Sequence, residues 1–178
     1  MGDSADRRPG EGLLWAAPLT EAQAERLKER IYATITIVAV LMGLFRSPDI
    51  SHADAALVVV ITAAGLWAAM LSADWQVYRI VHGVHPHGRD RRRMVYVTAP
   101  LLSSAVLPLL LIWLSALGLL TLGAALLVSA MANTAGLFLW GLVGGMRMGA
   151  RPVGAVMTGL FNLSIGALII FIKFLVDD

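Results

Sequence analysis

The chain has 178 residues, of which 58% are hydrophobic and only 15% are charged, and its formal net charge is +2. Soluble proteins carry about a quarter charged residues, so this composition indicates an integral membrane protein and excludes a disordered chain or a basic nucleic-acid-binding domain. The chain has no cysteine, which excludes disulfides, thiolate metal sites and cysteine nucleophiles.

Residues 1–30 are polar and charged, and they predict a cytoplasmic tail that ends in a short charged helix. Thr20 and Gln23 have the spacing of a capping box, in which each side chain accepts a hydrogen bond from the other residue's backbone amide. A tail without regular structure is the alternative interpretation.

Five apolar stretches follow and predict an all-α bundle of five transmembrane helices. We expect them at about 31–46, 55–82, 95–116, 119–145 and 153–176. The first is short, at about 22 Å of helix against a hydrocarbon core of roughly 30 Å, so its flanks must supply length. Residues 94–146 carry no charge and would form a single helix of roughly 80 Å, so the chain must turn back near Gly118. Pro100 and Pro108 predict kinks in the third span.

The lysines and arginines predict the orientation of the spans. Five precede the first span, and the successive connections hold one, five, none and two. Because positive residues concentrate on the cytoplasmic side, the N-terminus is expected inside and the C-terminus outside. The sequence thus predicts a multi-pass protein of the cell (inner) membrane. We expect the basic run of the second connection to contact anionic lipid headgroups rather than nucleic acid; its arginines are Arg89, Arg91, Arg92 and Arg93.

Asp74, Tyr78 and His82 recur at steps of four and therefore share one face at the cytoplasmic end of the second span. An ionisable residue within a span is a functional candidate, so this face predicts a site that handles protons or cations. The alternative is an interfacial helix end at which Asp74 pairs with an arginine such as Arg79.

His82, His85 and His87 have a spacing that resembles a metal site. Gly83 and Pro86 interrupt the helix that would hold these ligands, and the nearby arginines oppose a bound cation. We therefore predict no metal site, and whether the three histidines bind metal is left open.

A second polar stripe runs along the last two spans. Ser129 and Asn133 lie on the fourth span and Thr158 and Asn162 on the fifth, among small residues at similar spacing. Small residues allow close helix packing, so the two spans are expected to form a tight antiparallel hairpin in which Asn133 faces Asn162. The stripe serves either plain packing or the lining of a permeation path.

The chain contains no phosphate-binding loop, no H-E-x-x-H and no G-x-S-x-G motif, so we expect neither an enzyme nor a cofactor. The polar stripes favour a homo-oligomeric protein for transport or for ion or proton permeation. The alternative is a membrane scaffold or accessory subunit that transports nothing, because most of the signals are also typical of helix packing.

The segment from Leu126 to Gly141, followed by Arg151 and Pro152 and a last span that contains glycine, resembles the vacuolar iron transporter (VIT-like) family. This resemblance implies five spans, a cytoplasmic N-terminus, an external C-terminus and dimerisation through the membrane region. The family's acidic insert between spans two and three has no counterpart here, because that connection is short and rich in arginine. The chain also resembles small membrane proteins of high-GC bacteria.

Overall fold

The structure is a computed structural model and describes residues 20–47, 49–147 and 151–175. It contains the helices α1 (Glu21–Phe45), α2 (His52–His82), α3 (Arg89–Ser103), α4 (Val106–Ala116), α5 (Leu122–Arg147) and α6 (Pro152–Leu175). The prediction of an all-α fold is confirmed for this part of the chain. Four segments are long and apolar enough to cross a membrane, namely α2, α3 with α4, α5, and α6 up to Ile172.

Helix α1 begins with the capping box that the sequence predicts. The Thr20 hydroxyl accepts from the Gln23 amide at 3.4 Å, and the Gln23 side chain accepts from the Thr20 amide at 3.0 Å. The charged segment and the first apolar stretch form one helix of 25 residues, and the position of the membrane boundary near residue 30 stays a prediction. A continuous helix keeps every backbone amide paired at the point where the chain becomes apolar.

Helix α2 begins at the Ser51 cap, whose side chain accepts from the Asp54 amide at 3.1 Å. It continues for 31 residues and ends at Gly83, which has a φ of 69°. A left-handed residue of this kind is the common way to terminate a helix, and glycine adopts it without a steric penalty.

The third predicted span is interrupted, as its prolines suggest. α3 ends at Ser103 and α4 begins at Val106, so the two helices replace one continuous helix over 95–116. Pro108 has no N–H to donate to the carbonyl four residues earlier, which favours a break there. The chain then turns at Gly118, where φ is 80°, and this confirms the predicted position of the turn.

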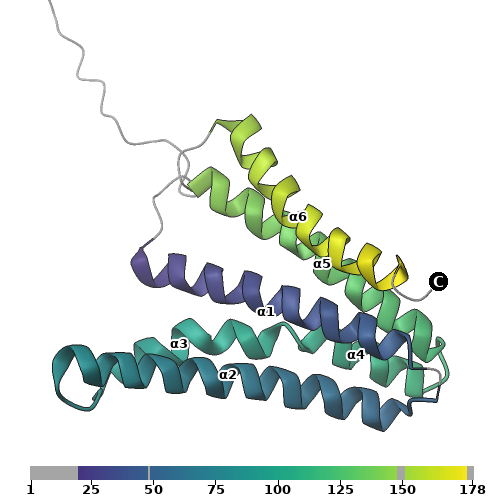
Figure 1. Cartoon of the computed structure of the whole chain (residues 1–178), viewed down its shortest axis with the longest axis horizontal. Coiled ribbons are helices and arrows are strands. Elements are labelled where there is room, and N and C mark those ends of the chain that lie inside the picture. The colour runs from purple at the N-terminus through teal and green to yellow at the C-terminus, as the bar shows by residue number, and fades with distance from the viewer. Residues whose placement is uncertain (1–19, 48, 148–150, 176–178) are drawn as a thin grey trace, which may run out of the picture.

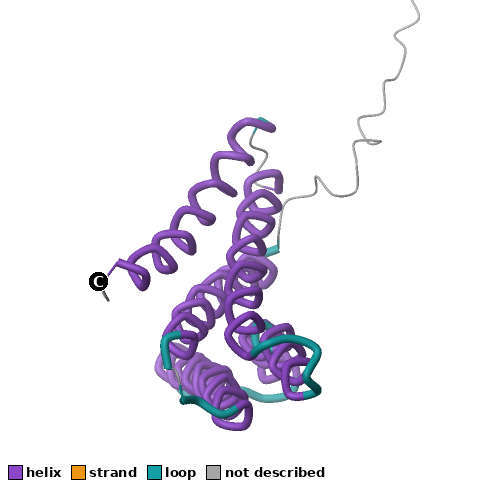
Figure 2. The backbone as a smooth tube through the Cα atoms, turned by 90° about the vertical axis from the view of Figure 1, so that its right-hand side faces the viewer, coloured by secondary structure: helices purple, strands orange, loops and turns teal. Residues whose placement is uncertain are grey.

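Helix α1 occupies the middle of the molecule, with α5 and α6 on one side and α2, α3 and α4 on the other (Figure 1). It runs antiparallel to α5, because Gly144 packs near Leu27 at one end and Gly123 near Phe45 at the other. The helix that ends at the C-terminal label, α6, lies at the outside of the bundle (Figure 2). The N-terminal half of α1 therefore lies between α5 and α3, although Glu21, Gln23, Ala24 and Lys28 stay exposed.

The interior between α1, α2, α4 and α5 is apolar. Its fully or almost fully buried side chains are Ile37, Leu41, Met42, Val59, Ala63, Ile112, Leu126 and Ala130. Close packing of such groups holds membrane helices together, because lipid offers little hydrophobic drive for their association.

The two ends of the bundle differ in charge. One end of the bundle, which we call the basic end, is formed by the starts of α1, α3 and α6 and the ends of α2 and α5. Among the described residues it carries ten lysines and arginines, namely Arg26, Lys28, Arg30, Arg79, Arg89, Arg91, Arg92, Arg93, Arg147 and Arg151. At the opposite end, Nε2 of His52 on α2 lies 3.1 Å from the hydroxyl of Ser115 on α4, and this contact joins the two helices.

Candidate functional site

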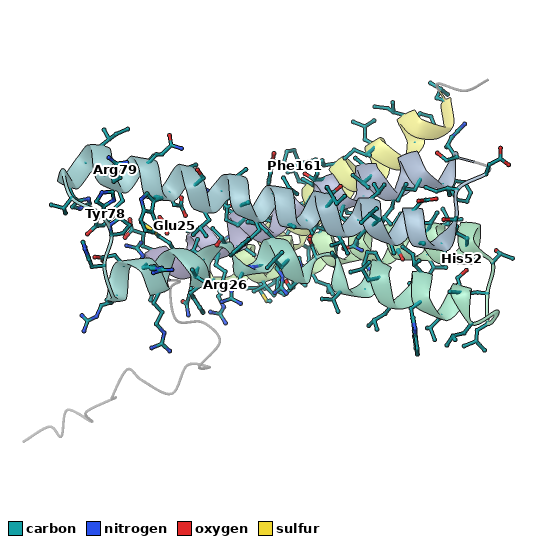
Figure 3. The ribbon with its side chains drawn as sticks, turned by 90° about the horizontal axis from the view of Figure 1, so that it is seen from below. Glu25, Arg26, His52, Tyr78, Arg79 and Phe161 are labelled. Atoms are coloured by element: carbon teal, nitrogen blue, oxygen red, sulfur yellow. The ribbon has the colours of Figure 1, made fainter. Side chains whose placement is uncertain are left out.

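A cleft of about 360 Å³ opens at the basic end between α1, α2 and α3. Its polar lining residues are Glu21, Glu25, Lys28, Glu29, Asp74, Tyr78, His82, Asp90 and Arg93, and its apolar ones are Val77, Val81, Met94 and Val97. Figure 3 shows Glu25 and Tyr78 at this end, while His52 lies at the other. Five carboxylates face two formal positive charges, so the cleft is acidic although the surrounding end of the bundle is basic.

Most of these carboxylates already have partners. Nη2 of Arg93 lies 3.5 Å from Glu21 and 3.3 Å from Glu25, which ties α3 to α1. The Tyr78 hydroxyl donates to Asp90 at 2.9 Å, and this bond ties α2 to the start of α3. The three helices that form the cleft are thus joined across it by ionic and polar contacts.

Glu29 has a partner at only one of its two carboxylate oxygens. The residue is only 5% exposed, and its Oε1 lies 3.2 Å from Nζ of Lys28. Its Oε2 is buried and has no hydrogen-bond partner among the described residues. A buried carboxylate oxygen without a partner is costly, so this atom marks a place where a cation or a proton would be stabilised.

Asp74 is half-buried and lines the same cleft as Glu29. Within the described part of the chain it makes no hydrogen bond or ion pair, so the alternative interpretation, a pair with Arg79, is not what the structure shows. Asp74 and Glu29 come from different helices, α2 and α1, and leave acceptor oxygens available in one space.

The predicted face of Asp74, Tyr78 and His82 is brought together, since all three side chains line the cleft. The rings of Tyr78 and His82 stack with centroids 4.2 Å apart, and Nδ1 of His82 lies 3.1 Å from the Tyr78 carbonyl oxygen. The ring of His85 instead lies 6.3 Å from that of Trp75, and His87 is exposed. No three His, Asp or Glu side chains of the described residues are arranged to hold a metal ion.

Two arginines fix α1 beside the cleft. The guanidinium carbon of Arg26 lies 4.2 Å from the ring centroid of Tyr96, and that of Arg30 lies 4.1 Å from the ring centroid of Trp140. Nη2 of Arg30 also donates to the Ser103 hydroxyl at 3.4 Å. Burial, and then the charge of Arg26, lower the pKa of the Arg30 guanidinium, but a group with so high a starting pKa stays charged.

The basic run of the second connection divides into two groups. Arg93 faces Glu21 and Glu25 and so contributes to the cleft. Arg89, Arg91 and Arg92 are exposed, and their contact with lipid headgroups stays a prediction.

The last two helices form the close antiparallel hairpin that the sequence predicts. A Cβ atom added to Gly145 would lie 2.6 Å from the Cα of Ala155, and one added to Gly166 would lie 2.8 Å from Cγ2 of Thr134. The two backbones therefore meet at glycines, as small-residue packing requires.

The expectation that Asn133 faces Asn162 is wrong. Nδ2 of Asn162 lies beside Gly141, and Gly141 is eight residues from Asn133, or roughly 12 Å along α5. The Asn133 amide instead donates to the Ser129 carbonyl at 2.9 Å. Ser129 and Thr158 likewise donate to carbonyls of their own helices, at 2.7 Å and 3.0 Å. Ser129, Asn133 and Thr158 thus each find a partner one turn away in their own helix, so none of these three has to reach across the hairpin.

The acidic residues of α1 are the part of the site that sequence reasoning missed. Glu21, Glu25 and Glu29 recur at steps of four and so share one face of a helix, which is the same signal that identified Asp74 and Tyr78. The polar composition of this segment predicts a tail outside the bundle, and a tail gives such a period no function.

Comparisons with protein-family models, with curated proteins and with solved structures found no match to this chain.

Proposed function

We propose that the protein is a homo-oligomeric membrane transport protein that takes a cation into the acidic cleft at its basic end. The observation that carries this proposal is the buried Oε2 of Glu29, which has no partner among the described residues in a cleft where carboxylates outnumber basic groups. Lys28 pairs with the other oxygen of this carboxylate, but a buried oxygen without a hydrogen bond still costs about 1–3 kcal/mol, and a bound cation would remove that cost. Asp74 on the facing helix supplies a second carboxylate.

The proposal includes a topology. Helix α1 is the fifth span, since its residues 31–45 are apolar and it is enclosed by the other helices. The basic end faces the cytoplasm because lysine and arginine concentrate there, which favours a cytoplasmic N-terminus in a cell (inner) membrane. The cleft then opens toward the cytoplasm.

Passage through the protein requires more than the cleft. Beyond it the bundle interior is filled by Ile37, Leu41, Met42 and the apolar side chains around them. A cation crosses such an interior only if the helices rearrange or if assembled copies enclose a polar route, and this supports an oligomeric transport protein rather than a monomeric pore.

The test is cation flux in liposomes that contain the purified protein. We expect flux of protons or small cations that falls at least tenfold in Asp74→Asn and in Glu29→Gln. Asp49→Asn is the matched control, because it removes the same charge from an exposed residue at the other end of the bundle. Flux that is absent under every gradient, or unchanged in both cleft variants, would contradict the proposal.

A scaffold or accessory subunit is the second candidate. It is favoured by the hydroxyls of Ser129 and Thr158 and the amide of Asn133, which bond within their own helices as packing groups do. Purification from native membranes separates the two functions. A stoichiometric partner of different sequence together with an absence of flux supports the scaffold, whereas self-assembly with flux supports transport.

A further inference from the structure

We infer that the ligand of the cleft is a small organic ammonium ion, held by Glu29 and Asp74 at its charged end and by the apolar wall of the cleft along its carbon chain. This inference rests on the proposed function in taking the cleft as a cation site, and it names the chemical class of that cation.

The ammonium group of the ligand is inferred from the carboxylate oxygens of the cleft that have no partner. Arg93 occupies Glu21 and Glu25, Tyr78 occupies one oxygen of Asp90, and Lys28 lies beside Oε1 of Glu29. The acceptors left are Oε2 of Glu29 and the carboxylate of Asp74. A primary ammonium group carries three N–H donors and can therefore bond more than one carboxylate oxygen, as the lysine side chain does in proteins.

The carbon chain of the ligand is inferred from the apolar residues that line the cleft. Val77 and Val81 line the cleft one and two turns beyond Asp74 on α2, Met94 and Val97 line it from α3, and Val77 and Val81 are 59% and 69% exposed. A hydrated inorganic ion gains nothing from such a surface, whereas each methylene group that becomes buried strengthens binding about fourfold. The stacked rings of Tyr78 and His82 add an aromatic face at the edge of the cleft, where a cation is also stabilised.

The size of the cleft agrees with this class of ligand. Its volume of about 360 Å³ lies at the lower end of the range for small-molecule sites, roughly 300–1,000 Å³. Such sites combine apolar surface with polar groups that fix orientation, and this cleft contains both, although nine of its thirteen lining residues are polar.

The experiment is calorimetric titration of the full chain in lipid nanodiscs with methyl-, ethyl-, propyl- and butylammonium chloride, with empty nanodiscs as the blank. We expect affinity to rise about fourfold for each added methylene. Asp74→Asn and Glu29→Gln should each weaken butylammonium binding at least tenfold, whereas Asp49→Asn should bind like the wild type. Asp74 is half-buried, so its variant tests the site even where loss of the buried Glu29 carboxylate unfolds the protein.

Three results would overturn the inference. An affinity that does not change with chain length would show that the cleft recognises charge alone. Equal binding of butanol would show that it recognises only apolar surface, and Asp74→Asn that binds like the wild type would place the ligand elsewhere. Because this titration needs no flux, butylammonium binding without transport would overturn the proposed function and leave the site standing. Flux of protons or metal ions without amine binding would support the proposed function and overturn the inference that the ligand is an organic ammonium ion.

Discussion

Nη1 of Arg26 donates to the backbone carbonyl oxygen of Tyr96 across the α1–α3 contact, at 3.3 Å. In an uninterrupted helix that carbonyl would accept from the amide of residue 100, but residue 100 is a proline and has no N–H. The arginine therefore satisfies an acceptor that the proline leaves free, and it also lies over the Tyr96 ring. A proline inside α3 thus becomes a docking point for α1.

This relationship predicts coupling between the two positions. Arg26→Met should cost about 1–2 kcal/mol of unfolding free energy, because it removes a charged hydrogen bond and a cation–π contact. In a Pro100→Ala background the alanine amide can satisfy the Tyr96 carbonyl, so the cost of Arg26→Met should fall by about 0.5 kcal/mol or more. A double-mutant cycle of unfolding in detergent measures this coupling, and strictly additive effects would contradict it.

The contact between Arg30 and Trp140 predicts a large effect of one tryptophan. Trp140→Leu should destabilise the protein by about 1–2 kcal/mol, because the partly buried Arg30 loses its aromatic partner. Trp113→Leu is the matched control and should change stability by less than about 0.5 kcal/mol, since that ring is 60% exposed. Equal losses in the two variants, measured by unfolding in detergent, would show that the Arg30 contact adds nothing.

The glycines of the α5–α6 contact should tolerate no side chain. Gly145→Ala should cost about 1–3 kcal/mol, because the new methyl group would meet the backbone of Ala155, which cannot yield without separating the helices. At Gly65 on α2 nothing lies within 4 Å of the added carbon. There the same substitution should stabilise the protein by about 0.5–1 kcal/mol through helix propensity. If both variants unfold at the same detergent concentration, the close approach of α5 and α6 does not contribute to stability.

The proposed topology predicts labelling from opposite sides of the membrane. A cysteine in place of Asp49 should react with a membrane-impermeant maleimide in intact cells. One in place of Arg91 should react only after the cells are opened, because it lies at the basic end. The chain has no cysteine of its own, so the background is zero. The reverse pattern would invert the orientation, and labelling of both positions from outside would exclude α2, the helix between them, as a span.

Arg93 should affect the cation affinity of the cleft more than it affects the stability of the fold. Its ion pairs with Glu21 and Glu25 are largely exposed, so Arg93→Gln should cost less than about 1 kcal/mol of stability. The same change frees two carboxylates beside the cleft and should strengthen cation binding, most of all at low salt. Arg91→Gln, outside the cleft, controls for the general loss of a positive charge, and weaker binding by Arg93→Gln than by this control would contradict the prediction.

Sequence patterns predicted most of the fold because each boundary has a local cause. The Thr20 capping box, the turn at Gly118 and the prolines of the third span act on the backbone within one or two turns of where they stand. The positions at which helices meet depend on register instead, and register is set by all contacts of a helix pair together. Asn162 therefore lies beside Gly141 rather than Asn133, although the spacing of polar residues along each helix was correct.

In the site, too, the positions set within one helix were predictable from the sequence, whereas the contacts between helices were not. Asp74, Tyr78 and His82 were found because periodicity within one helix places them on one face. Their neighbours Glu25 and Glu29 come from a segment at least 45 residues earlier in the chain. Composition marked that segment as a surface tail, and only its continuation into the apolar part of α1 places these carboxylates in the cleft.

The contact between His52 and Ser115 closes one end of the bundle, whereas the other end is open. The His52–Ser115 contact joins α2 to α4 at this end. At the other end, the cleft separates α1, α2 and α3. A carrier that works by alternating exposure must release one such contact and close the opposite mouth in each cycle. Under the proposed transport function, the conformation described here is the state that accepts or releases the cation on the basic side, and the His52–Ser115 contact has to open in the other half of the cycle.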